Sequence, residues 1–246
     1  MKWYTKHMDK VKDSAILAKR ALEVQRGGAR AAVLGVNDGL VSVLCIVLTV
    51  AGAQASAHNV LLAGFAGLIA GAVSMAAGEW ISVRAQVELF GGILKDVRKL
   101  LKEDSQLLAG QVADSLTQSG YTNKTATAAA YEISKDNHNF VGVYARQVMG
   151  FNPDELGSPW RAAGSSLALF TLGALAPLLP WFFGGGIRSI WLSIILTALG
   201  GLVVGGYISS SSGKGITKGA MRQLGIIVLA SIVTYGIGYL FGVSAR

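Results

Sequence analysis

The stretch AGFAGLIAGAVSMAAGEWISVR, residues 63–84, decides the fold class. It is apolar and rich in glycine, and its length matches the about 20 residues that cross the hydrocarbon core of a bilayer. It also contains Glu79. An ionisable side chain in such a helix costs about 2.5 kcal/mol or more on insertion scales and usually marks a functional site. We therefore predict a membrane-spanning helix with a functional carboxylate; the alternative for Glu79 is a structural hydrogen bond to a neighbouring helix.

Met75 lies four residues before Glu79, so its thioether and the carboxylate share one face of this predicted helix. Taken alone, Met75 fits a core-filling role equally well. Gly67 and Gly71, earlier in the same helix, have the spacing that lets membrane helices approach closely.

The composition indicates a polytopic membrane protein. The chain has 246 residues, of which 52% are hydrophobic and 15% charged, and it contains several uncharged runs near 20 residues long. The formal charge of +8 does not indicate nucleic-acid binding, because the basic residues lie between apolar runs without interleaved stacking aromatics. The single cysteine, Cys45, excludes an intrachain disulfide.

We predict an all-α fold with five transmembrane helices and a cytoplasmic helical segment between the second and third spans. The first span is expected at about 31–53, and the second follows the link 54–59 and ends at about 84. The other three spans are expected at about 160–183, 190–210 and 219–243. The chain then divides into an N-terminal amphipathic cytoplasmic segment (1–30), helices one and two (31–84), the cytoplasmic segment (85–158) and helices three to five (159–246).

The two cytoplasmic segments differ in character. Residues 1–30 carry eight basic side chains and a weak helical period, which fits a helix lying at an anionic membrane face or a solvated helix. Residues 85–158 are charged and have helical spacing but no run long enough to span a membrane. We expect two or three amphipathic helices there, with breaks near Ser119-Gly120 and between Gly150 and Pro159.

The basic residues predict the orientation. With the N-terminus in the cytoplasm, 20 of the 22 lysines and arginines fall on the cytoplasmic side, and Arg188 and Arg246 fall on the other. This agrees with the positive-inside rule. Five spans place the C-terminus on the opposite side from the N-terminus.

Asp38 and Glu79 are the acidic residues that fall within the predicted spans. Asn37-Asp38-Gly39 would form a turn in a soluble protein, but within this apolar run we expect a helix whose glycines admit another backbone or an ion. With this orientation we expect both carboxylates near the cytoplasmic side, where they can lie at similar depth in neighbouring helices. With the Met75 thioether they suit a divalent transition ion, and the soft sulfur favours Fe(II). Carboxylates in a low dielectric also take up protons, which offers a way to couple metal to protons.

The motifs resemble those of the vacuolar iron transporter family. The resemblance rests on GVNDGLVS (35–42), AGAVSMAAGEWIS (70–82), DELGSPWRAA (154–163) and LGALAPLLP (172–180). It implies a homodimer with five spans per chain that moves Fe(II), and often Mn(II), out of the cytosol in exchange for protons. It also implies that Asp38, Met75 and Glu79 line the pore.

The cytoplasmic segment departs from the family pattern. Family members with this segment usually carry glutamates that capture metal beneath the pore, whereas Gln111 and Gln147 occupy two positions where glutamate is expected. Glu88 is the best remaining candidate ligand, and a solvated residue beside the membrane is its alternative. We therefore expect weak metal binding here.

The leading hypothesis is a proton-coupled exporter of divalent metal, not an enzyme. The sequence shows no histidine-rich cluster, nucleophile motif or phosphate-binding loop, which disfavours a membrane metalloenzyme. The alternative is a non-transporting scaffold or regulator with the same fold. We expect no cofactor; the expected partners are metal ions, protons, the lipid bilayer and a second copy of the chain.

Overall fold

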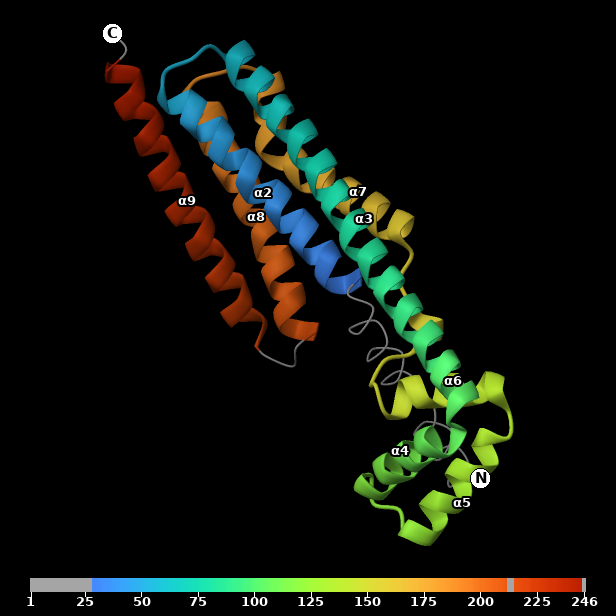
Figure 1. Cartoon of the computed structure of the whole chain (residues 1–246). Coiled ribbons are helices and arrows are strands. Elements are labelled where there is room, and N and C mark those ends of the chain that lie inside the picture. The colour runs from blue at the N-terminus through green and yellow to red at the C-terminus, as the bar shows by residue number, and fades with distance from the viewer. Residues whose placement is uncertain (1–27, 212–214, 245–246) are drawn as a thin grey trace, which may run out of the picture. The chain divides into compact units, whose positions relative to one another are not determined.

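The computed structural model describes residues 28–211 and 215–244, and all regular elements in these ranges are helices (Figure 1). The predicted amphipathic segment 1–30 therefore lies outside the described residues except for its last three. The elements are α2 (Gly28–Gly52), α3 (Ala57–Glu103), α4 (Ser105–Gln118), α5 (Asn123–Ser134), α6 (Asn137–Gln147), η1 (Pro153–Glu155), α7 (Pro159–Leu178), η2 (Leu179–Phe182), α8 (Ile187–Ser211) and α9 (Ile216–Ser244).

The chain forms two compact units. Of the described residues, 28–80, 159–211 and 215–244 form the membrane unit, and 81–158 form the second unit. Within the described ranges, α2, α3, α7, α8 and α9 are long and apolar enough to cross a membrane. The all-α polytopic fold with five spans is thus confirmed, and Asn37-Asp38-Gly39 lies within α2 rather than in a turn.

Helix α2 lies beside α7, α8 and α9 in the membrane unit (Figure 1). The α2–α7 contact is made by backbone: a Cβ atom at Gly39 would lie 2.1 Å from the carbonyl oxygen of Phe170, and one at Gly173 would lie 2.2 Å from that of Val36. Side chains larger than glycine would force these helices apart. The expectation that the glycine beside Asp38 admits another backbone is confirmed.

Gly67 and Gly71 of α3 face side chains, whereas Gly39 and Gly173 face backbone atoms. A Cβ atom at Gly67 would lie 2.3 Å from the Ile46 side chain, and one at Gly71 would lie 2.3 Å from the ring of Phe170. The Gly67-x-x-x-Gly71 spacing therefore receives two large side chains rather than a neighbouring helix backbone. The GxxxG spacing predicts a close approach at these glycines. It does not show whether the partner is a side chain, as here, or the backbone of another helix.

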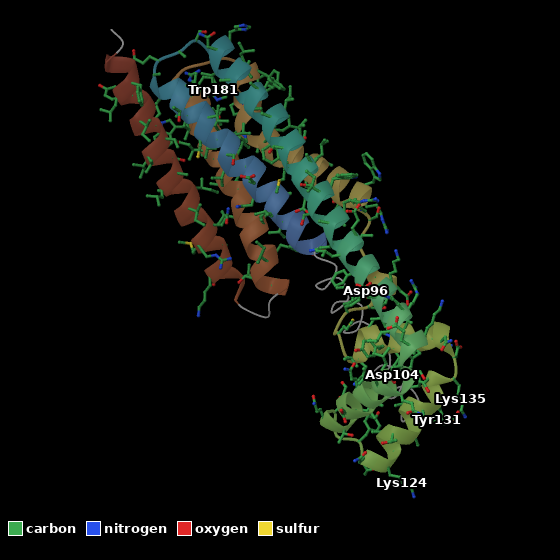
Figure 2. The ribbon with its side chains drawn as sticks, viewed as in Figure 1. Asp96, Asp104, Lys124, Tyr131, Lys135 and Trp181 are labelled. Carbon is green, nitrogen blue, oxygen red and sulfur yellow. The ribbon has the colours of Figure 1, made fainter. Side chains whose placement is uncertain are left out.

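Helix α8 stabilises the proline-containing end of α7. Pro177 and Pro180 remove backbone donors here, and η2 replaces the last regular turn. The Ser193 hydroxyl donates to the Pro177 carbonyl over 2.7 Å and accepts from Trp181 Nε1 over 2.9 Å, while Ser189 donates to the Pro180 carbonyl over 3.3 Å. Figure 2 labels Trp181 in the membrane unit. Such side-chain bonds allow prolines in membrane helices.

The second unit has its own apolar core. It contains the end of α3, α4, α5 and α6, and its buried side chains include Leu101, Leu108, Val112, Phe140 and Tyr144. The breaks predicted near Gly120 and Gly150 are present, and both glycines have positive φ angles, +100° and +74°.

The predicted end of the second span near Arg84 is not a helix end. Helix α3 continues to Glu103, and Asp104 then caps α4 by accepting from the backbone N–H of Leu107 over 2.9 Å. The helix continues because Leu94, Val97 and Leu101 extend its apolar stripe into the core of the second unit.

Candidate functional site

Asp38 lies on α2 in the membrane unit, with its side chain partly exposed. The Ser42 hydroxyl, one turn later on the same helix, donates to Asp38 Oδ1. Within residues 28–211 and 215–244, neither Asp38 nor Glu79 takes part in a salt bridge. No basic side chain among the described residues therefore pairs with either carboxylate.

Met75 lies one turn beyond Gly71 on α3 and is partly buried against the core cluster that contains Ala72 and Phe170. Phe170 links the two helices, because its ring fills the space over Gly71 and its backbone contacts Gly39, the residue after Asp38. The structure thus brings the turns that carry Asp38 and Met75 against one common residue of α7. Met75 takes part in packing, which is compatible with a second role as a sulfur ligand.

Glu79 follows Met75 by one turn, about 6 Å along the axis of α3, and its side chain is partly exposed. The next residue, Trp80, packs against Trp160 of α7 with ring centroids 5.8 Å apart in an edge-to-face arrangement. The aromatic pair ties α3 to the beginning of α7 beside Glu79. Trp80 Nε1 is buried and has no hydrogen-bond partner among the described residues.

One chain supplies few metal ligands. Among the described residues, no three His, Cys, Asp or Glu side chains gather into a group that could hold a metal ion. Asp38, Met75 and Glu79 therefore offer at most two carboxylates and a thioether, so that completing a coordination sphere requires water, backbone oxygens or a second chain.

Gln223 on α9 is a further buried polar residue beside this site, one that the sequence motifs did not point to. This side chain is only 5% exposed and its Nε2 donates to the side-chain oxygen of Asn37, the residue before Asp38. The sequence feature that could have pointed to Gln223 is its amide within an apolar stretch, because polar side chains in membrane spans usually bond to another helix.

The candidate ligands of the second unit are already paired. Glu88 forms an exposed ion pair with Arg84, with 2.5 Å between Oε1 and Nε. The side-chain amide of Gln147 on α6 donates over 3.2 Å to the hydroxyl of Ser119, the C-cap residue of α4, and the Gln147 backbone carbonyl accepts from Ser115 of α4 over 2.9 Å. The bonds of Gln147 therefore join α4 and α6, whereas the Arg84–Glu88 pair lies within α3.

Gln111 of α4 is paired in the same way, because its side-chain oxygen accepts from the Tyr144 hydroxyl of α6. Burial raises the pKa of Tyr144. The phenol therefore keeps its proton and remains a donor to Gln111 throughout the physiological range.

Comparison with known proteins identifies the family. The sequence profile of the VIT family matches residues 29–239 of this chain. The chain belongs to the VIT family. It is 32% identical to vacuolar iron transporter homolog 1 of Oryza sativa subsp. japonica over 218 residues, which cover 87% of this chain and 73% of the relative.

Two further relatives show that similarity extends beyond one lineage. The chain is 31% identical to vacuolar iron transporter homolog 3 of Arabidopsis thaliana, over 87% of this chain and 82% of the relative. It is also 31% identical to a vacuolar iron transporter of Acanthamoeba castellanii, over 87% of this chain and 78% of the relative. The VIT resemblance predicted from the motifs is confirmed, and membership places the chain among transporters rather than enzymes.

Proposed function

We propose that this chain exports a divalent transition metal from the cytosol, with Fe(II) as its main substrate and Mn(II) as a second one. The observation that carries the proposal is a pair of carboxylates in two apolar helices: Asp38 lies on α2, and Glu79 lies on α3 one turn after Met75. Neither carboxylate has a salt-bridge partner among the described residues. Membership of a family whose relatives bear the name iron transporter supports it.

The proposed active form is a homodimer. Asp38 and Glu79 are partly exposed on a single chain, and a carboxylate that faces lipid is costly. A second copy that covers these side chains removes them from lipid and doubles the number of ligands. A site shared across a two-fold axis is typical of the symmetry of homodimers.

The proposed driving force is proton exchange. A carboxylate binds either a proton or a metal ion, so protons that enter from the far side can displace the metal from Asp38 and Glu79. The metal then leaves on the side opposite the cytoplasm, while the protons are released into it. The proposed orientation has the N-terminus in the cytoplasm.

The test is metal uptake into proteoliposomes. Purified protein is reconstituted, and uptake of Fe(II), Mn(II), Co(II) and Zn(II) is measured with and without an imposed pH gradient. We expect Fe(II) uptake that the gradient accelerates, together with counter-movement of protons reported by a trapped pH dye. Equal uptake by protein-containing and empty vesicles contradicts metal transport. Uptake that does not depend on the pH gradient contradicts proton exchange but leaves metal transport standing.

One observation favours a second function, that of a membrane scaffold or regulator. The second unit uses Gln111 and Gln147 to join α4 and α6, and Glu88 is paired with Arg84. A unit built for helix contacts rather than for metal capture suits a structural role. Absence of transport in the vesicle assay, with a folded dimer, supports this second function.

A further inference from the structure

Gln223 is a buried polar side chain whose position the proposed metal pathway does not explain. It lies about two turns inside the apolar helix α9, is 5% exposed, and donates through Nε2 to Asn37 Oδ1 on α2. Polar side chains in membrane helices commonly bond to a neighbouring helix, and such bonds help to hold the two helices together.

Helix α8 leaves room for the Gln223 side chain. A Cβ atom at Gly205 would lie 3.0 Å from Gln223 Cβ, and one at Gly201 would lie 3.1 Å from Gln223 Cγ. Two glycines on α8 therefore form the surface over which the aliphatic part of Gln223 passes. The aliphatic part of Gln223 thus packs against α8, and its amide bonds to Asn37 on α2.

The bond acts next to the proposed ligand. Asn37 directly precedes Asp38, and successive residues of a helix point about 100° apart. Holding Asn37 toward α9 therefore adds a restraint on the rotation of this turn of α2, beside the backbone contact of α2 with α7 at Gly39, and so on the direction in which Asp38 projects. Further along α2, the Thr49 hydroxyl donates to the Thr234 carbonyl of α9 over 3.3 Å, about three turns from Asn37.

We infer that Gln223 is a positioning residue for the metal pathway: by holding Asn37, it sets the orientation of Asp38 toward the transported ion. The inference rests on the proposed function. Outer partners of metal ligands typically change metal affinity by about 10- to 100-fold when they are removed. We therefore expect Gln223→Leu to raise the half-saturating Fe(II) concentration about 10-fold, with a smaller change in maximal rate.

The experiment uses a length swap. Gln223→Asn shortens one partner by a methylene and Asn37→Gln lengthens the other, so each single variant mismatches the pair. The double variant Asn37→Gln/Gln223→Asn restores the summed length, and we expect it to recover much of the lost affinity. Ser231→Ala is the matched control, because Ser231 is also buried on α9, at 7% exposure, but donates to the carbonyl of Ile227 in its own helix.

A second measurement does not depend on transport. Dicyclohexylcarbodiimide modifies protonated carboxyl groups within membranes, and mass spectrometry reports its rate at Asp38. We expect Gln223→Leu to change this rate more than twofold in metal-free protein, the swap to restore it, and Ser231→Ala to leave it unchanged. Circular dichroism and size-exclusion chromatography confirm that each variant is folded.

The outcomes separate the two ideas. If the wild-type protein takes up no metal, the proposed function is refuted. The rate at which dicyclohexylcarbodiimide labels Asp38 then still decides whether Gln223 positions this carboxylate. An unchanged labelling rate in folded Gln223→Leu overturns the inference. A swap variant that is no better than the two single variants overturns it as well.

Discussion

Asp38 and Glu79 are the residues on which we expect the proposed transport to depend most directly. Their isosteric amides keep the shape of the side chain but lose the charge that attracts a dication. We predict that Asp38→Asn or Glu79→Gln lowers Fe(II) uptake into proteoliposomes by about 100-fold or more, since each removes a charged ligand from a low-dielectric site.

The matched control for these variants is Asp96→Asn, which removes an exposed carboxylate of the second unit (Figure 2). We expect its uptake to equal that of the wild type. Full uptake by both pore variants would show that the ion passes elsewhere.

Met75 is predicted to select among metals. Met75→Leu conserves volume, so it preserves the packing against the cluster that contains Phe170. It removes the soft sulfur donor, which favours Fe(II) over harder ions. We expect the ratio of Fe(II) to Mn(II) uptake to fall several-fold, measured by competition in one vesicle preparation. An unchanged ratio would show that Met75 only packs.

At the scale of the secondary-structure elements, α8 supplies a test of how the end of α7 is stabilised. Ser193→Ala removes the acceptor of Trp181 Nε1 and the donor to the Pro177 carbonyl. Buried groups left without a partner cost about 1–3 kcal/mol. We expect a lower midpoint of thermal unfolding in detergent, followed by the near-ultraviolet signal of tryptophan.

Thr197→Val is the control for this prediction. Thr197 lies one turn further along α8, is also fully buried, and its hydroxyl has no partner among the described residues. Replacing an unpaired hydroxyl by a methyl group of the same shape is neutral or stabilising. A loss of stability in Thr197→Val as large as that in Ser193→Ala would show that packing, not hydrogen bonding, dominates here.

The α4–α6 contact provides a second prediction at this scale. Capture of a dication in water requires several converging carboxylates, because single exposed pairs contribute little. Gln111 and Gln147 are neutral and bonded across this contact. We expect the second unit to bind Mn(II) weakly, and Gln111→Glu/Gln147→Glu to strengthen binding about 10-fold or more, since the added ligands are charged.

Calorimetric titration of the full chain in detergent measures this binding. Every protein in this titration also carries Asp38→Asn/Glu79→Gln, so that Mn(II) binding at the proposed pore residues does not contribute to the signal. Tight binding of several ions before the glutamates are introduced would refute the idea that the second unit has lost metal capture.

For the whole molecule, the distribution of basic residues predicts topology. With five spans and a cytoplasmic N-terminus, we expect Lys124 in the cytoplasm and Ser244 on the opposite side. We expect Lys124→Cys, on a Cys45→Ala background, to react with an impermeant maleimide only from the cytoplasmic face, and Ser244→Cys only from the other. Lys124 is exposed in the second unit (Figure 2), so its reactivity reports sidedness rather than burial. Labelling of both positions from one face would require an even number of spans.

The sequence by itself determined the elements of this protein. Long apolar runs can satisfy their backbone groups in lipid only as helices, so hydropathy sufficed to predict the five spans and the all-α class. The motifs around Asp38 and Glu79 were enough to predict the VIT family, which the family comparison confirmed. The breaks at Gly120 and Gly150 were also predictable, because glycine readily adopts the positive φ angles found there.

Only the tertiary structure decided which residues meet. Helical period shows that Gly71 and Gly39 leave space, but not that Phe170 contacts both. In the same way, hydropathy marks Gln223 as unusual in α9 but does not show that its partner is Asn37, 186 positions earlier in the chain. The continuation of α3 to Glu103 likewise depends on the second core, in which Leu94 and Leu101 are buried. Local sequence specifies backbone conformation and one apolar face, whereas the partner of each face depends on contacts between distant segments that no local pattern encodes.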